Sequence, residues 1–235
     1  MLNYYIGMAE KQEVFTLLNG RVKMTHSFYN PTSDAVWLAA SAPQGAKTAL
    51  DVGIGTGGAS LCLLSHFPDL QITGLDISEK MLAECEKNML LNNHNIKLLN
   101  ADILKWSTPE RFDLVITNPP YFNGTPAKHN AHHNTDITKW IDRCSARVAP
   151  NGHICIIIDA LCAAKVIHIL DKKHFGNIEI FPLFGTKNKA ERLIIRAKSC
   201  VKTGSSIYSG LPMNNDMILR DGLTIDSLLS TLMTP

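Results

Sequence analysis

A glycine-rich segment that follows a short apolar run constrains the fold of this chain more than any other feature. Residues 48–52 are mostly apolar, and a helical pattern over residues 57–67 begins within the segment. Glycine adopts left-handed backbone angles at little cost and lets the main chain come close to a ligand. A strand, a glycine turn and a helix in this order are typical of a nucleotide-cofactor loop in a parallel sheet. The glycines of the segment are Gly53, Gly55, Gly57 and Gly58.

Strand-like and helix-like patterns continue to alternate after this loop. Alternation of this kind predicts an α/β fold with a doubly wound, mostly parallel sheet of seven strands. A short connection between the last two strands predicts an antiparallel hairpin at the edge of the sheet. Strands are predicted at residues 48–52, 70–75, 96–99, 112–116, 153–158, 177–183 and 191–197. Helices are predicted at residues 57–67, 79–91, 138–148 and 161–170.

The pattern divides the chain into three parts. Residues 1–46 form an N-terminal flanking segment, in which residues 14–18 are predicted to be helical and residues 21–28 to contain a small strand. Residues 47–198 form the α/β domain. Residues 199–235 carry several glycine, proline and asparagine loop signals, and we expect a partly ordered tail without an assigned role.

The overall composition is that of an ordinary soluble globular protein, with 45% hydrophobic and 19% charged residues. A net charge of +2 does not by itself indicate a nucleic-acid-binding protein, so local charge must carry that argument. The first residues lack the pattern of an export signal, and no apolar stretch is long enough to cross a bilayer. The six cysteines lack C-x-x-C spacing, so we expect reduced, mostly buried thiols in a cytoplasmic protein.

Three acidic residues at the ends of successive predicted strands are suited to hold a cofactor. Asp51 can bind a positively charged amine, Asp76 can bind both hydroxyls of a ribose, and Asp102 can accept a hydrogen bond from an adenine amino group. Ile77 and Ile103 follow the last two acids and can cover the faces of the adenine ring. The glycines also fit the G-x-G-x-x-G pattern of a dinucleotide oxidoreductase, but no later segment resembles a hydride-transfer site. The acids therefore favour S-adenosylmethionine as the cofactor.

The chemistry is predicted from the segment Asn118-Pro119-Pro120-Tyr121, which follows the fourth strand. The Asn118 side-chain oxygen and the Pro119 carbonyl can accept hydrogen bonds from a planar amino group, whose lone pair then points at an activated methyl carbon. Neither proline donates an N–H, so Pro119 and Pro120 stiffen the turn and leave its carbonyls available. Tyr121 or Phe122 can stack on the target ring. Alignment and fixed dipoles would supply most of the rate gain, so the segment predicts methyl transfer to nitrogen.

Together, the glycine loop and the Asn-Pro-Pro-Tyr motif resemble the Rossmann-like class I methyltransferases that act on amino groups. The resemblance narrows to bacterial valine-tRNA adenine-N6 methyltransferases at residues 20–22, 30–40, 181–182 and 190–193. It implies methylation of an adenine beside a tRNA anticodon, and packing of the segment around Asp34 over the methionine end of the cofactor. Where that family usually carries Ala-Arg-His, this chain has Ala131-His132-His133, so an arginine that could contact phosphate is absent.

Positive charge clusters in and after the connection between the last two predicted strands. Residues 184–202 contain six basic residues and one acidic residue, and Lys128 and Lys139 lie near the catalytic segment in the sequence. The cluster can be an RNA phosphate track or a solvated edge strand protected by lysines. The resemblance favours RNA, with Lys187, Lys189 and Arg192 as substrate-binding residues.

Other functions remain open at this stage. Enzymes that methylate a glutamine of peptide release factors also use Asn-Pro-Pro-Tyr, although they usually have a longer helical N-terminal domain than the 46 residues that precede the core here. An rRNA amino group is a further alternative substrate, whereas a non-catalytic RNA-binding module would need neither Asn118 nor Asp76. His129, His132 and His133 have near-ligand spacing, but we predict a substrate loop there and no metal site. The sequence does not indicate an oligomeric state.

Overall fold

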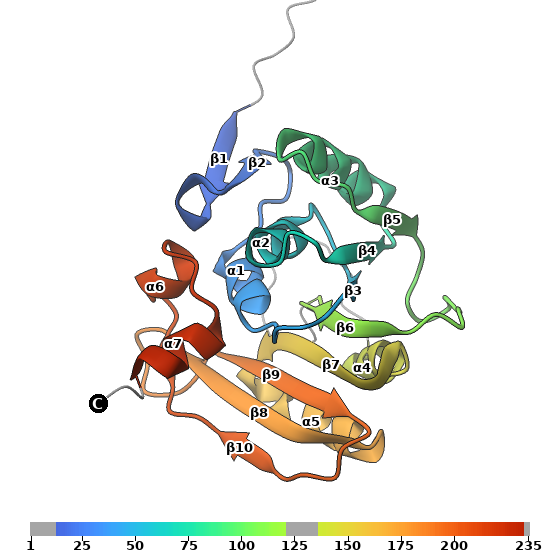
Figure 1. Cartoon of the computed structure of the whole chain (residues 1–235), viewed down its shortest axis with the longest axis vertical. Helices are drawn as coiled ribbons and strands as arrows, with labels where there is room; N and C mark the ends of the chain where they lie inside the picture. Colours follow the sequence, from blue (N-terminus) through green and yellow to red (C-terminus); the bar gives the residue numbers. More distant parts are fainter. Residues whose placement is uncertain (1–12, 121–135, 233–235) are drawn as a thin grey trace, which may run out of the picture.

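The computed structural model of the chain describes residues 13–120 and 136–232. A large mixed sheet crosses the molecule (Figure 1). Its strands are β3 (Thr48–Val52), β4 (Gln71–Asp76), β5 (Lys97–Asn100), β6 (Phe112–Thr117), β7 (Val148–Asp159), β8 (Phe175–Phe184), β9 (Arg192–Ser199), β10 (Ser205–Ile207) and β11 (Leu211–Pro212). The strand order is β10-β8-β9-β7-β6-β3-β4-β5, and β11 also pairs with β8. All pairs are parallel except β7 with β9 and β8 with β9.

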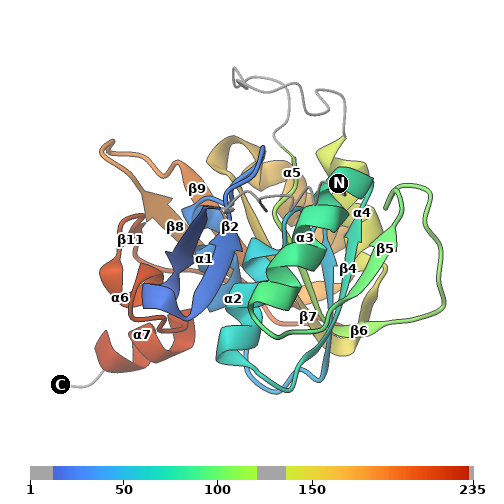
Figure 2. The same ribbon diagram turned by 90° about the horizontal axis from the view of Figure 1, so that it is seen from above.

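Helices cover both faces of this sheet (Figures 1 and 2). One hydrophobic cluster joins one face to α1 (Ser33–Ala40), α2 (Gly58–His66) and α3 (Glu79–Leu91), and it continues into the tail helices α6 (Asp216–Leu219) and α7 (Ile225–Leu232). A second cluster joins the other face to α4 (Ile137–Ser145) and α5 (Ala163–Lys172). Adjacent strand residues such as Ala49 and Leu50 belong to different clusters, as the alternation of a two-sided sheet requires. Short 3-10 turns occupy Leu18–Gly20 and Ala160–Cys162.

These elements confirm the predicted α/β sheet with an antiparallel hairpin of β8 and β9. All seven predicted core strands and four predicted helices are present, with ends that shift by a few residues; the largest shift is β7, which begins at Val148 and not at residue 153. Within the described residues, no helix is long and apolar enough to span a membrane. The six cysteines are free thiols, and four of them are buried.

The N-terminal flank differs from the prediction. Residues 14–18 were expected to be helical, but β1 (Val14–Leu17) is a strand that pairs antiparallel with β2 (Val22–Thr25). The physical reason is the alternation of the side chains, because Phe15 and Leu17 are half-buried while Val14 and Thr16 are exposed. The small strand expected within residues 21–28 is confirmed as β2.

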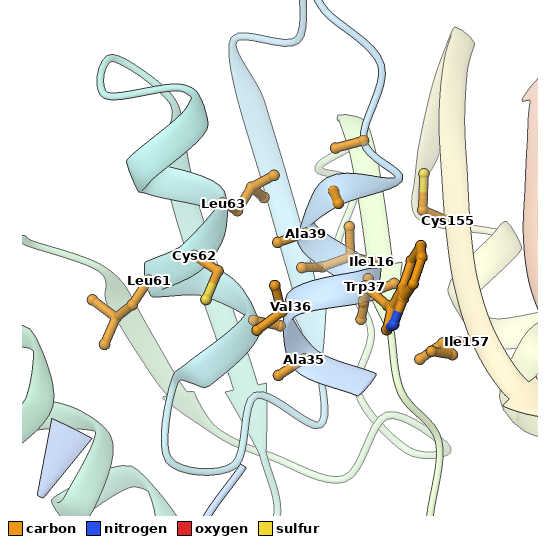
Figure 3. Packing of buried hydrophobic residues seen from close by; sticks show 14 of the residues in the cluster. Ala35, Val36, Trp37, Ala39, Leu61, Cys62, Leu63, Ile116, Cys155 and Ile157 are labelled. Carbon is orange, nitrogen blue, oxygen red and sulfur yellow. The ribbon is translucent and has the colours of Figure 1, made fainter. Parts of the chain in front are cut away.

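The helix α1 was not predicted, because its sequence lacks an amphipathic pattern. Residues 34–40 are all buried between the sheet, α2 and the tail. Figure 3 shows Trp37 of α1 directed toward Cys155 and Ile157 of β7. The Trp37 indole N–H donates to the Met213 carbonyl at 3.0 Å, which ties α1 to the tail.

The tail is more ordered than predicted. Its strands β10 and β11 extend the sheet beyond β8, so the predicted edge hairpin is itself covered. Arg196 of β9 is buried and pairs with Glu179 of β8 at 2.7 Å and with Asp226 of α7 at 2.8 Å. These ion pairs dock α7 against the hairpin.

Candidate functional site

The glycine loop between β3 and α2 lies at the carboxyl edge of the parallel strands. Gly53, Gly55 and Gly57 have φ angles of +78°, +57° and +89°, which side chains of other residues rarely allow. The N–H of Gly53 donates to the carbonyl of Leu75 at 2.8 Å, which fixes the start of the loop against β4. A Cβ added to Gly57 would lie only 2.8 Å from Cys85 Sγ. The loop therefore needs glycine for both its backbone angles and its close packing.

Asp51, the first predicted cofactor residue, is buried near the end of β3. The Ser60 hydroxyl donates to Asp51 Oδ2 at 2.7 Å. Burial raises the pKa of Asp51 to about 7, although the Ser60 hydrogen bond opposes this shift, and the nearby charge of Asp76 raises the pKa further. Within the described residues, no salt bridge joins Asp51 to a basic side chain. A buried carboxylate of this kind is suited to bind a positively charged amine.

Asp76 ends β4 and holds the glycine loop in place. Its Oδ2 accepts the Gly55 N–H at 2.9 Å, and its Oδ1 accepts the Ser78 N–H at 2.9 Å. Asn100 at the end of β5 donates to the carbonyls of Asp76 at 3.3 Å and Ile77 at 3.1 Å. Ile77 is 54% exposed, so its side chain is available to cover a ligand ring. Sequence reasoning missed Asn100, although a polar residue at a strand end was a usable signal.

Asp102 and Ile103 follow β5 and differ in their exposure. Asp102 is half-buried, and its Oδ1 accepts the Leu104 N–H at 2.9 Å. Ile103 is only 2% exposed and belongs to the cluster that contains Val52 and Leu75. The buried position of Ile103 does not support its predicted role as a cover for an adenine ring, because its side chain fills the core.

The end of β6 brings Asn118 beside the glycine loop. Thr117 pairs in register with Val52, so Asn118 follows at the level of Gly53. The Thr117 hydroxyl donates to the Val52 carbonyl at 2.8 Å and accepts the indole N–H of Trp140 at 3.0 Å. Asn118 is half-buried, as is Pro120, whereas Pro119 is buried. Predicted residues of the following segment lie outside the described residues, namely Tyr121, Phe122, Lys128, His129, His132 and His133.

The segment before α1 packs against the glycine loop. A Cβ added to Gly58 would lie 2.6 Å from Pro31 Cβ, and one added to Gly55 would lie 3.9 Å from Tyr29 Cε1. Asp34 follows in the first turn of α1 and is buried. The packing of the segment around Asp34 over the methionine end of the cofactor, which the family resemblance implied, stays a prediction.

The predicted basic cluster is not one continuous surface. Because β9 runs antiparallel to β7, Arg192 lies opposite Asp159 at the carboxyl edge, and Lys198 lies opposite His153 toward the other end of the sheet. Arg196 between them is buried in its ion pairs. Arg192 pairs with Asp34 and Asp159, so its assignment as a substrate-binding residue is not supported. Lys187 and Lys189 remain exposed in the β8–β9 turn at the carboxyl edge.

Comparison with known proteins identifies the family of this chain. A family model described as the methyltransferase small domain matches residues 35–183, well over half of the chain. The chain belongs to this family. A relative named tRNA1(Val) (adenine(37)-N6)-methyltransferase from a Flavobacteriaceae bacterium is 31% identical over 175 residues, which cover 71% of this chain and 76% of that protein. These matches confirm the resemblance predicted from the sequence.

Two further comparisons concern a second relative and a solved structure. The equally named protein of Glaesserella parasuis is 30% identical over 57% of this chain, and the match spans 61% of its length, less than two thirds. A crystal structure described as a predicted O-methyltransferase from Agrobacterium tumefaciens has a TM-score of 0.64 at 22% identity, covering 77% of this chain and 87% of that one. That structure supports the α/β fold of this chain.

Proposed function

We propose that this protein transfers a methyl group from S-adenosylmethionine to the exocyclic N6 of an adenine in tRNA. The observation that carries the proposal is the pairing of β3 with β6, which sets Asn118 beside the glycine loop. The glycine loop, which would bind the cofactor, and Asn118, which would accept hydrogen bonds from the target amino group, therefore lie at the same edge of the sheet. The names of the curated relatives support tRNA adenine over a protein glutamine as the substrate.

The described residues fit S-adenosylmethionine. Asp51 is a buried acid that would bind the amine of the methionine moiety, and Asp76 would bind the ribose hydroxyls. Asp102 and the exposed Ile77 would contact the adenine. The Thr56 hydroxyl of the glycine loop is buried without a hydrogen-bond partner among the described residues, which leaves a polar atom available in the same loop. When bound, the cofactor supplies a methyl group activated by a positively charged sulfur.

The protein's own contribution is alignment. The Asn118 side-chain oxygen and the Pro119 carbonyl would accept both N–H groups of the target amine and so direct its lone pair. The amide and carbonyl dipoles would face the positive charge that develops on the nitrogen. A strong base is not needed, because the methylated ammonium product is acidic and releases its proton readily.

Lys187 and Lys189 supply the proposed contact with RNA. They lie in the β8–β9 turn, at the same edge as Asn118, and both are exposed. Cations at this edge would bind phosphates on either side of the target base. A tRNA substrate would in turn imply a cytoplasmic location.

A labelling experiment tests the proposal. The purified protein is incubated with methyl-labelled S-adenosylmethionine and either unmodified tRNA or a peptide release factor, and the labelled RNA is digested to nucleosides. We expect label in N6-methyladenosine of tRNA. Label in the release factor alone would overturn the proposed substrate, and binding of the cofactor without any transfer would overturn the proposed activity.

A further inference from the structure

Asn88 of α3 connects the N-terminal hairpin to the glycine loop. We propose that Asn88 is a positioning residue, which holds the glycine loop in the conformation that binds the cofactor and is itself oriented by Thr25 of the β1–β2 hairpin. This inference rests on the proposed function, since it concerns the same cofactor. The hairpin precedes residue 35, where the match to the family model begins, so the match itself does not include it.

The side chain of Asn88 is buried, with 1% of its surface exposed, and its polar atoms all have partners. Its Oδ1 accepts the Thr25 N–H at 2.8 Å and the Thr25 hydroxyl at 3.0 Å. Its Nδ2 donates to the Thr56 carbonyl at 3.0 Å. The orientation of the amide is fixed by chemistry, because a backbone N–H can only donate and a carbonyl can only accept.

The contact with Thr56 acts between two glycines of the loop. Thr56 lies between Gly55 and Gly57, which both have left-handed backbone angles. Glycine does not by itself fix the backbone in one conformation. Asp76 holds one side of this point through the Gly55 N–H, and Asn88 holds the other through the Thr56 carbonyl. Loss of the Asn88 bond would leave a buried carbonyl unsatisfied and allow the loop to leave its binding conformation.

The chain provides a matched control one helical turn later. Asn92 also joins α3 to β2, because its Oδ1 accepts the Lys23 N–H at 2.8 Å and its Nδ2 donates to the Lys23 carbonyl. Its other hydrogen bond goes to the carbonyl of Asn88 and not to the glycine loop. A change at Asn92 therefore weakens the hairpin attachment without removing a contact to the loop.

The experiment compares Asn88→Asp with Asn92→Asp in the full-length protein. Each change replaces the amide NH2 by an oxygen of similar size, so Asn88→Asp places two acceptors opposite each other at Thr56. Calorimetry with S-adenosylmethionine should give a Kd about tenfold higher for Asn88→Asp, as expected if roughly one molecule in ten keeps the competent loop. Asn92→Asp should bind like the unmodified protein. In enzyme assays, KM for the cofactor should rise while kcat changes little.

Amide hydrogen exchange of residues 53–58 provides a readout that does not depend on the cofactor. Exchange should accelerate in Asn88→Asp and not in Asn92→Asp. If Asn88→Asp does not fold, Thr25→Val removes only the hydroxyl that holds the Asn88 oxygen, and it should raise Kd about threefold through a smaller loss of competent loop.

Equal affinity and equal exchange of all variants would overturn the role of Asn88. Equal losses in Asn88→Asp and Asn92→Asp would also overturn it, because the effect would then come from hairpin attachment alone. Failure of the unmodified protein to bind S-adenosylmethionine would instead overturn the proposed function, and the exchange measurement would still decide the role of Asn88.

Discussion

The guanidinium Nε of Arg192 lies 3.1 Å from Asp34 Oδ2, so the first residue of β9 is joined to the first turn of α1. A second carboxylate oxygen, on Asp159 at the end of β7, lies 3.7 Å from Arg192 Nη1. Asp34 is buried, and Arg192 is largely covered. Arg192 therefore forms ion pairs within the protein, at the edge of the sheet where α1 meets the proposed site.

Arg192→Gln is expected to lower the free energy of unfolding by roughly 3 kcal/mol, because it removes the cation that lies 3.1 Å from the buried carboxylate of Asp34. Urea denaturation measures this loss. Adding Asp34→Asn should restore part of the stability, since the carboxylate charge that faced Arg192 is then also removed. The salt dependence of RNA binding should not change. A flatter salt dependence with unaltered stability would restore the original assignment of Arg192 to the RNA.

The core of the fold could be predicted because its signals are local. Apolar runs predict the core strands, and the spacing of apolar residues within 79–91 predicts a helix. The helix α3 has the predicted bounds. The helix α1 could not be predicted in this way, since burial on all sides removes the amphipathic pattern. The tail was predicted to be partly ordered, but its strands and helices were not assigned, because they depend on distant contacts such as Met213 with Trp37.

In the candidate site, too, local features could be predicted from the sequence and contacts between distant residues could not. The turn of Gly53, Gly55 and Gly57 could be predicted because the spacing of a strand, a glycine turn and a helix is local. The binding of a cofactor by this turn and by Asp51 stays a prediction. The pairing of Arg192 with Asp34 could not be found, because it joins residues 158 positions apart. The charge count of residues 184–202 was correct, but β9 carries these charges to opposite ends of the sheet and buries Arg196. A count of charges along a strand therefore does not define a surface.

Replacement of Lys187 and Lys189 by alanine should weaken tRNA binding. It should also reduce the steepness with which log K falls against log salt by about 1.5, as expected for two lost phosphate contacts. The matched control is the double replacement of Lys198 and Lys202 by alanine. These lysines come from the same cluster, but they lie toward the opposite end of the sheet. Filter binding at several salt concentrations measures both slopes. An unchanged slope for the Lys187 and Lys189 double variant would remove the β8–β9 turn from the RNA-binding surface.

The stability of the protein without cofactor should depend on the protonation of Asp51. Burial raises the pKa of Asp51 from 3.8 to about 7, so the folded protein holds more protons than the unfolded chain between these values. Asp51 therefore reduces stability progressively as the pH rises through this range. Asp51→Asn should be more stable than the unmodified protein above pH 7, and the difference should disappear near pH 4. Urea denaturation across this pH range tests the sign, and a constant difference would contradict it.

Cofactor affinity should show the opposite pH trend, because an ammonium partner favours ionised Asp51. The Kd for S-adenosylmethionine should rise by up to about tenfold per pH unit below pH 7. It should also rise above about pH 8, where an α-amino group loses its charge. Calorimetry over this range should give strongest binding between the two limits. Asp51→Asn should bind weakly and lose the acidic limb, so an unchanged acidic limb in that variant would assign the titration to another group.

Asn118→Ala should lower kcat by about a hundredfold while the Kd for S-adenosylmethionine stays nearly constant, because the amide is proposed to act on the amino group during transfer. Single-turnover transfer to tRNA and calorimetry measure the two quantities. Asn100→Ala provides the contrasting control, since Asn100 donates to the carbonyls of Asp76 and Ile77 on the cofactor side. Its Kd should rise while its turnover at saturating cofactor changes little. Parallel losses of affinity and turnover in Asn118→Ala would mean that Asn118 supports the loop rather than the reaction, and that the strand end beside Gly53 has only a structural role.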